Sequence, residues 1–134
     1  MGEIRKGMKG SASVVVGPGD LASAYGNPGV DVASSMTLMM VMEQAALAAV
    51  AGAVEPGQMC VGTRMEMDHL APTPEGMRIE ATAEVVEMEG RKIVFKVEAR
   101  DELEVVGRAV HTRYIVERAR FMAGVKAKVE KMGK

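Results

Sequence analysis

A single carboxylate interrupts the most apolar stretch of this chain. Residues 35–54, SMTLMMVMEQAALAAVAGAV, carry apolar side chains at almost every position, and Glu43 stands near the middle. Apolar residues on all sides are typical of a helix that is buried all round. Burying an ionised carboxylate without a partner costs several kcal/mol, so such a group either pairs or raises its pKa. We therefore expect Glu43 to be buried with a raised pKa, and it is the first candidate for chemistry.

Two other residues suited to acid–base chemistry accompany this carboxylate. His69 stands just before the turn LAPTPEG, where a side chain can face a cleft, and Ser35 precedes Glu43 by eight residues. On a helix, that spacing puts Ser35 and Glu43 within roughly 80° of each other and about 12 Å apart along the axis. They are too far apart to hydrogen-bond, but both can border one elongated cleft. Ser35 can equally be a plain N-cap, a role that Ser34 also suits, and His69 beside Asp68 can be merely solvated.

The second histidine, His111, has two interpretations that the sequence leaves open. By strand alternation it lies on the same face as Arg113. It is either a buried, hydrogen-bonded core residue or a member of the site.

Other chemical signatures are missing from the sequence. One cysteine and two distant histidines do not make a zinc site. There is no Gly-x-Ser-x-Gly elbow, and no phosphate-binding glycine loop. We therefore expect neither a metal nor a cofactor. Cys60, the single cysteine, cannot form an internal disulfide and fits a reducing cytoplasm.

Charge and hydropathy argue against two classes of partner. The formal net charge of −1 gives no electrostatic reason to expect nucleic acid or an anionic membrane. The apolar stretch has the roughly 20 residues that span a bilayer, but Glu43 and Gln44 lie at its centre. A central acid costs about 2.5–3.5 kcal/mol in a membrane, so we expect no membrane span. Residues 2–10 are charged and short, and we expect no secretion signal there.

The rest of the chain alternates with the period of a strand. Alternation is cleanest over residues 77–85, where every second side chain is apolar. In chain order, the patterns predict a strand at 10–16, a helical turn at 20–25 capped by Asp20, the long helix to about 54, strands at 59–70, 77–85, 93–99 and 103–116, and an amphipathic helix at 117–131.

This order predicts an α+β hot-dog fold, in which one antiparallel sheet wraps a long apolar helix and buries it on most sides. Gly107 and Ala109 keep the last strand slim where the helix must approach. Residues 1–134 form one domain, with a core at about 8–116 and a C-terminal helix at about 117–131. Open sheet edges favour pairing with another copy, so a homodimer is expected, with a tetramer left open.

On these residues the chain resembles the fluoroacetyl-CoA thioesterase group of hot-dog proteins. The resemblance runs from about Ala33 to Phe121 and includes the apolar helix with its glutamate. It also includes the segments VEPGQMCVGT, HLAPTPEG, VEMEGRKIVFKVEARD and GRAVHTR.

The resemblance implies a set of site residues. In that family a hydroxyl residue, a glutamate and a histidine form the catalytic set, and they fall on Ser35, Glu43 and His69. A glycine whose backbone contacts the substrate falls on Gly62, and a substrate-binding arginine falls on Arg113, which would meet the CoA phosphates or position the carboxylate.

The implied reaction is hydrolysis of a short-chain acyl-CoA thioester in a cleft at a dimer interface. Glu43 would act as general base or nucleophile, while His69 would orient the carboxylate or protonate the leaving thiolate. The family's fluoroacetyl-CoA enzyme has threonine in place of Ser35, and its aromatic lid residue falls near Gly29. We therefore expect a short acyl-CoA other than fluoroacetyl-CoA.

Two other interpretations stay open. The protein could hold an acyl-CoA or another apolar ligand without hydrolysing it. It could also be a structural subunit in which Glu43 is paired with Arg113 or His69 as a buried stabilising ion pair.

Overall fold

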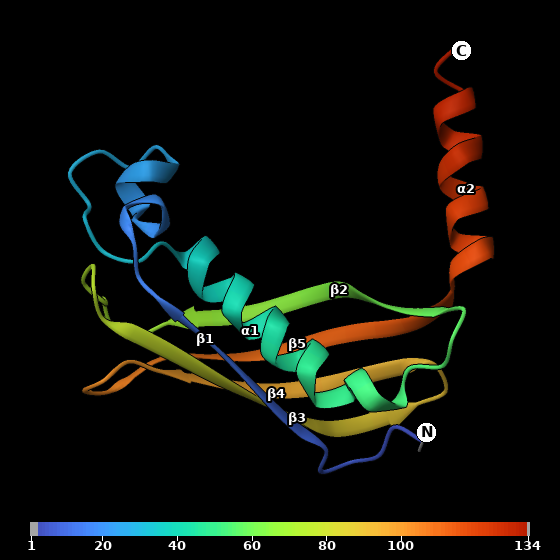
Figure 1. The fold of residues 1–134 in the computed structure, drawn as a ribbon, viewed down its shortest axis with the longest axis horizontal. Coiled ribbons are helices and arrows are strands. Elements are labelled where there is room, and N and C mark those ends of the chain that lie inside the picture. The colour runs from blue at the N-terminus through green and yellow to red at the C-terminus, as the bar shows by residue number, and fades with distance from the viewer. Residues whose placement is uncertain (1–2, 134) are drawn as a thin grey trace.

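The computed structural model describes residues 3–133 of the chain (Figure 1). Residues 1, 2 and 134 lie outside the described residues. Residue 2 is also the first residue of the segment 2–10, in which we expect no secretion signal. The elements in order are β1 (Lys9–Val15), η1 (Pro18–Asp20), η2 (Ala22–Tyr25), α1 (Ser35–Val50), η3 (Ala51–Ala53), β2 (Gln58–His69), β3 (Arg78–Glu89), β4 (Lys92–Arg100), β5 (Val105–Glu117) and α2 (Arg118–Glu130).

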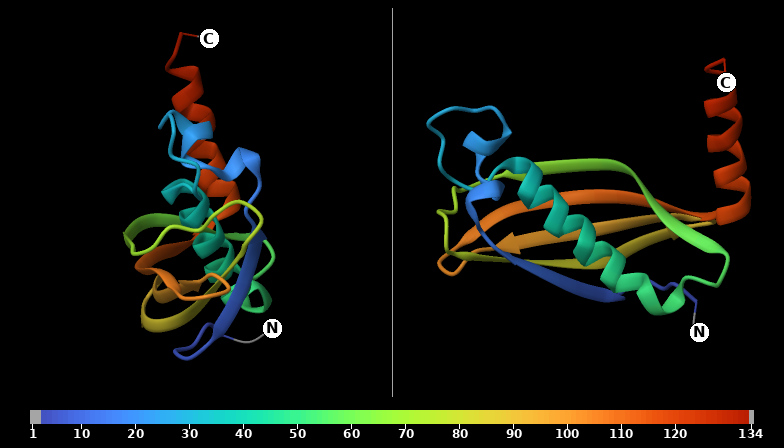
Figure 2. Two further views of the ribbon diagram at one scale, coloured as in Figure 1. Left: turned by 90° about the vertical axis from the view of Figure 1, so that its left-hand side faces the viewer. Right: turned by 45° about the horizontal axis from the view of Figure 1, so that its top comes forward.

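The five strands form one antiparallel sheet in the order β1-β3-β4-β5-β2. The sheet curls, and α1 lies across its concave face (Figures 1 and 2). The predicted α+β architecture of one long helix against an antiparallel sheet is therefore confirmed. β1 and β2 are the edge strands, so β2 hydrogen-bonds to β5 on one side and has no strand on the other.

The predicted end of β3 is wrong by four residues. The strand continues to Glu89 instead of stopping at Val85. A bulge between Val85 and Glu87 shifts the register with β4. An extra residue at a bulge reverses which side chains face the core, so the alternating pattern breaks although the strand does not.

The predicted helical turn before α1 is present in a different form. Two 3-10 helices, η1 and η2, replace it, and Asp20 ends the first instead of capping the second. The Asp20 carboxylate accepts a hydrogen bond from the backbone N–H of Gly17 at 2.9 Å. This closes the Gly-Pro-Gly turn that leads out of β1.

Two glycines let the sheet approach α1 closely. A Cβ on Gly10 of β1 would overlap the backbone nitrogen of Ala49. A Cβ on Gly107 of β5 would lie 2.7 Å from Leu38 and 3.1 Å from Met42. The expectation that Gly107 makes room for the helix is confirmed. In β1, the missing side chain of Gly10 makes room for α1 in the same way.

The expectation that α1 is buried on most sides is wrong for the single chain. The sheet covers one side of the helix, where Leu38, Val41 and Met42 are fully buried. The opposite side carries an exposed stripe, defined here as Met36, Met40, Glu43 and Leu47, whose three apolar members are 40–56% exposed. A five-stranded sheet reaches only part of the way round a helix. The outward apolar residues are therefore free to contact another chain.

Within residues 3–133, one helical segment, Ser35–Ala53, is long and apolar enough to cross a membrane by length and composition alone. This segment comprises α1 and η3, and it supplies core side chains against the sheet. That packing is what the core helix of a globular domain shows.

The C-terminal helix α2 projects away from the sheet on the side where α1 lies (Figures 1 and 2). The predicted boundaries, 117–131, agree with the observed ones to within one residue. None of its residues is buried.

Candidate active site

Ser34, and not Ser35, caps the N-terminus of α1. Its Oγ accepts a hydrogen bond from the backbone N–H of Thr37 at 3.0 Å. The Thr37 hydroxyl in turn donates to the backbone carbonyl of Asp20 at 3.0 Å. Ser34 meets the preference of this position for a short hydroxyl side chain, and its neighbour Ser35 is free for another role.

Ser35 contacts His69 directly. The Ser35 Oγ lies 2.8 Å from Nδ1 of the imidazole. Ser35 is the first residue of α1 and His69 is the last residue of β2, so the pair joins two elements that are far apart in sequence. The amides in the first turn of a helix lack intrahelical partners and carry partial positive charge. A hydroxyl, an imidazole and a helix N-terminus together suit stabilisation of a developing oxyanion.

The environment of His69 favours its neutral form. Partial burial lowers the pKa of the imidazole below its usual value, and a hydrogen bond to the backbone of Ala71 opposes this in part. A neutral imidazole can accept a proton from a hydroxyl or from water. His69 is therefore suited to acid–base work near neutral pH.

A pocket of about 320 Å³ opens beside this pair. Its walls are the segment 22–35, which leads into α1, and the segment 69–72, which follows β2. The two segments are joined by the hydrogen bond from the N–H of Ala33 to the carbonyl of Thr73. The volume is at the lower end of the range for small-molecule sites.

Glu43 forms an ion pair with Arg113 of β5. Their closest atoms, Oε1 and Nη1, are 3.8 Å apart. The expected burial of Glu43 is wrong for the single chain, because its side chain is 44% exposed whereas that of Arg113 is only 6% exposed. The buried partner is the cation, and the carboxylate sits above it on the exposed stripe of α1.

Arg113 is held from below by β2. Its Nη2 donates to the carbonyl of Cys60 at 2.8 Å, and its Nε donates to the Cys60 thiol at 3.2 Å. This burial excludes the expected contact with CoA phosphates within a single chain. The other expected role, positioning the carboxylate, agrees with the contacts.

His111 completes the support of Arg113. The imidazole is buried, its Nε2 lies 3.1 Å from Arg113 Nη1, and its Nδ1 lies 2.7 Å from the carbonyl of Arg64. A guanidinium can only donate, so Nε2 must accept. Nδ1 therefore carries the proton and donates to Arg64. Of the two open interpretations of His111, the structure favours a buried, hydrogen-bonded residue that contacts the candidate site.

Gly62 lies against this cluster. It pairs with Arg113 across β2 and β5, next to a bulge between Gly62 and Arg64. A Cβ at this position would lie 3.1 Å from Arg113 Nη1 and 3.2 Å from His111 Cε1. Glycine therefore leaves the space that the arginine and histidine occupy.

The predicted site residues thus form two groups. One is the Ser35–His69 pair, and the other is Glu43 with Arg113, His111 and Gly62. Within residues 3–133, no hydrogen bond or ion pair joins Glu43 to Ser35 or His69. The expected contact of His69 with the carboxylate is absent, because about 12 Å of helix separates Ser35 from Glu43.

Comparison with known proteins decides the family. The profile of the family described as fluoroacetyl-CoA-specific thioesterase matches residues 16–119. The chain belongs to this thioesterase family. The fluoroacetyl-CoA thioesterase of Streptantibioticus cattleyicolor is 36% identical over 87 residues, which are 65% of this chain and 63% of the relative.

Solved structures agree with this assignment over nearly the whole chain. A variant of the fluoroacetyl-CoA-specific thioesterase with phenylalanine replaced by alanine superposes with a TM-score of 0.88 at 28% identity, covering 96% of this chain and 99% of that one. A thioesterase superfamily member from Thermus thermophilus superposes with a TM-score of 0.92 at 26% identity, covering 99% and 98%. The hot-dog fold predicted from the sequence is confirmed.

Sequence reasoning missed the contact between Cys60 and Arg113 in the candidate site. Cys60 was considered only for disulfides, and nothing in its neighbours along the chain points to Arg113. The contact depends on strand register, which pairs Cys60 with Ile115, two residues beyond Arg113. The role of Ser34 was visible as one of two capping candidates, and the structure decides between them.

Proposed function

We propose that this protein hydrolyses a short-chain acyl-CoA thioester to the free acid and CoA, in the cytoplasm. The observation that carries the proposal is the Ser35–His69 contact at the N-terminus of α1, beside a pocket of small-molecule size. Membership of a thioesterase family supports the choice of thioester chemistry over other acyl transfers.

The acyl group we favour is a short, unfluorinated one such as acetyl or propionyl. The Streptantibioticus relative is named for fluoroacetyl-CoA. A variant of that thioesterase in which serine replaces a threonine is described in complex with acetyl-CoA. This chain has a serine, Ser35, where the resemblance places that threonine. Apart from the imidazole of His69, the pocket is lined by small, aliphatic and polar residues, with no phenylalanine, tyrosine or tryptophan among them.

In the proposed reaction, Glu43 removes a proton from water as the water oxygen attacks the thioester carbonyl carbon. The alternative is attack by the carboxylate itself, followed by hydrolysis of the resulting anhydride. Ser35, the first amides of α1 and the Gly62 amide stabilise the oxyanion. The C–S bond then breaks, and the departing CoA sulfur takes a proton from the imidazolium form of His69. His69 afterwards regains a proton from solvent, and Glu43 releases the proton that it took from water. Arg113 keeps the carboxylate in place.

We further propose that the working unit is a homodimer with the cleft between its protomers. Two surfaces of the single chain support this, namely the unpaired edge of β2 and the apolar exposed stripe of α1. The stripe contains Glu43, so a second chain that covers it also borders the carboxylate. Because Ser35 and Glu43 of one chain are about 12 Å apart along α1, the reaction at a single carbonyl requires that Ser35 and His69 of one protomer face Glu43 and Gly62 of the other across this cleft.

The test is the variant Glu43→Gln, assayed for thiol release from acetyl-, propionyl- and fluoroacetyl-CoA with a thiol-reactive chromophore. The matched control is Glu87→Gln, which changes an exposed glutamate of β3 in the same way. We expect Glu43→Gln to lower turnover at least 100-fold, because general-base contributions are about 10²–10⁴-fold, and we expect the control to be unchanged. Unchanged turnover in Glu43→Gln would refute the assignment.

Two other outcomes identify the competing interpretations. Binding of CoA in calorimetry by the wild-type protein without thiol release indicates a ligand-binding protein. If the wild-type protein hydrolyses none of the three thioesters and Glu43→Gln melts at a lower temperature than the wild type, the Glu43–Arg113 pair is a structural ion pair.

A further inference from the structure

Helix α2 presents an apolar stripe that nothing in the described chain covers. The stripe is defined here as Phe121, Met122, Val125 and Val129, and these side chains are 41–51% exposed. An isolated helix of 13 residues is only marginally stable in water, and most helices depend on packing of an apolar face. The stripe therefore calls for a partner surface.

The same helix is strongly basic. α2 and the residue after it carry five cationic side chains, at positions 118, 120, 126, 128 and 131, against the single carboxylate of Glu130. None of these five takes part in an ion pair within residues 3–133. The partner surface should accordingly be acidic as well as apolar.

Such a surface exists at the other end of this same protein. We call it the pocket end, and it comprises residues 17–35 and 67–77, which meet around the Ser35–His69 pocket. It contains no lysine or arginine and has carboxylates on Asp20, Asp31 and Glu75. A fourth carboxylate, on Asp68, lies beside Arg108 on the other side of the sheet and does not count toward this surface. The pocket end also exposes apolar surface at Tyr25 and Leu70, and Met36 of α1 lies next to it in the chain; each of the three is at least half exposed.

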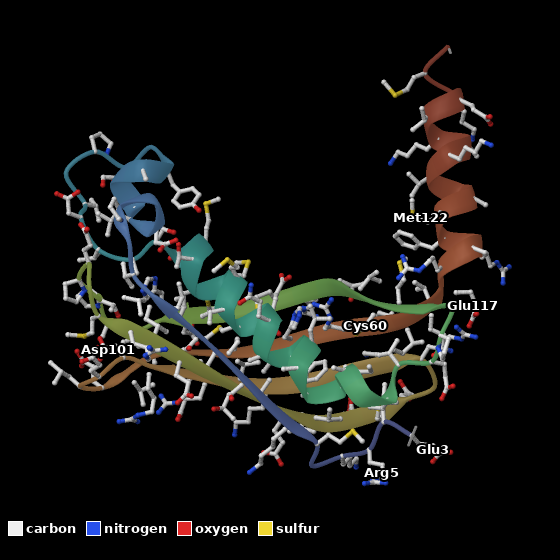
Figure 3. All side chains as sticks on the ribbon, viewed as in Figure 1. Glu3, Arg5, Cys60, Asp101, Glu117 and Met122 are labelled. Atoms are coloured by element: carbon white, nitrogen blue, oxygen red, sulfur yellow. The ribbon has the colours of Figure 1, made fainter. Side chains whose placement is uncertain are left out.

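Within one chain these two surfaces cannot meet, because they lie at opposite ends of the long axis (Figure 1). Figure 3 shows Met122 and Glu117 at one end and, at the other, Asp101, whose carboxylate accepts a hydrogen bond from Thr73 of the pocket end. Both surfaces lie on the side of the sheet that carries α1 (Figures 1 and 2).

Antiparallel pairing of β2 with β2 of a second copy brings the two surfaces together. β2 runs from Gln58, which pairs with Glu117 immediately before α2, to His69 at the pocket. In an antiparallel pair related by a two-fold axis, the Gln58 end of one strand lies beside the His69 end of the other. The α2 of each copy then stands next to the pocket end of its partner, on the same side of the extended sheet.

We infer that α2 is an arm whose apolar stripe docks on the pocket end of a second copy of this chain and closes the partner's Ser35–His69 pocket. This inference rests on the homodimer in the proposed function. It adds that each pocket takes one wall from the other chain, and that the arm's cations lie near the mouth through which a phosphorylated acyl carrier enters.

The first experiment locates the arm by zero-length carbodiimide cross-linking of the full-length protein, which joins lysines to carboxylates in contact. A mixture of ¹⁵N-labelled and unlabelled chains identifies cross-links between copies by mass. We expect mixed-isotope cross-links between the lysines of α2 and Asp31 or Glu75. A dimer whose α2 lysines cross-link only elsewhere overturns the inference.

The second experiment uses the double variant Met122→Asp/Val125→Asp, with Ala127→Asp on the opposite side of the same helix as the matched control. All three positions are exposed in the single chain, so circular dichroism should show folded protein in each case. Sedimentation should show the dimer dissociation constant raised at least tenfold by the double variant and unchanged by the control. The KM for acetyl-CoA should rise with it.

The outcomes separate this inference from the proposed function. Sedimentation and cross-linking need no substrate, so they test the arm even if the protein hydrolyses no thioester. A wild-type monomer, or a double variant that dimerises like the wild type, overturns the arm while leaving the activity assays unaffected. If the double variant dimerises like the wild type, the basic residues of α2 must contact a different acidic partner.

Discussion

Replacing His111 tests whether its two hydrogen bonds stabilise the buried Arg113. In His111→Phe the ring volume is roughly kept, but an N–H of Arg113 and the carbonyl of Arg64 lose the partners they have at 3.1 and 2.7 Å. Leaving a buried polar group unpaired costs about 1–3 kcal/mol. In His111→Gln the amide oxygen can accept from Arg113 and the amide N–H can donate to Arg64. We therefore expect His111→Phe to be less stable than His111→Gln by about 1–3 kcal/mol at pH 7.5.

The pH dependence sharpens this prediction. Burial is the largest cause that lowers the pKa of His111, and the nearby Arg113 lowers it further; the hydrogen bond to Arg64 and the charge of Glu43 act in the opposite direction. Because the folded-state pKa lies below the unfolded value of about 6.5, the stabilisation is complete above pH 6.5. It is lost as the pH falls through the lowered folded-state pKa, where protonation would also remove the acceptor for Arg113.

The assay is urea unfolding of wild type, His111→Gln and His111→Phe at pH 7.5 and 5.0. The free energy of unfolding of the wild type should fall more between these pH values than that of His111→Gln, since the shared carboxylate titrations cancel in the difference. His69 also has a lowered pKa, so His69→Gln serves as the control for the other imidazole. The reasoning fails if wild type and His111→Gln lose equal stability on acidification, or if His111→Phe matches His111→Gln at pH 7.5.

Two further predictions concern how α1 is positioned. Gly10→Ala should unfold the protein or destabilise it by more than about 3 kcal/mol, because its Cβ would overlap the helix backbone at Ala49. Gly52→Ala, with nothing within 4 Å of its Cβ, should be neutral or stabilising. Thermal unfolding of both variants checks this. Ser34→Ala should lower the free energy of unfolding by about 0.5–2 kcal/mol through loss of the N-cap. Ser35→Ala should instead lower acyl-CoA turnover with little effect on the free energy of unfolding. Equal losses of stability in the two variants would contradict this division of roles between Ser34 and Ser35.

Most of the fold could be predicted because each element has one dominant period. The long helix, the four strands after it and the C-terminal helix all lie close to their expected positions. The exception, the end of β3, fails at a bulge, where the alternating pattern changes phase while the backbone stays extended. A pattern of side chains cannot distinguish such a shift from the end of the strand.

The site could be predicted only in part. Ser35, Glu43 and His69 stand out because their residue types are unusual for their surroundings. The contact of Ser35 with His69 depends on where β2 ends relative to α1, and neither segment encodes that position alone. The support of Arg113 by Cys60 and His111 depends on register between β2 and β5. Register is a property of two strands together, so local patterns do not reveal it.

The exposed position of Glu43 brings the observations on α1 together. A helix packed on one side by a sheet needs an apolar stripe on that side only, yet α1 is apolar on its outer side too, at Met36, Met40 and Leu47. The apolar residues on the outer side of α1 would therefore be buried, as the sequence pattern indicates, only if a second chain covered them. That cover would desolvate Glu43 and strengthen its attraction to Arg113, because both charges would then lie away from water. In the proposed homodimer, α1 of one chain would therefore position the Glu43 carboxylate, and the second chain would exclude water from it.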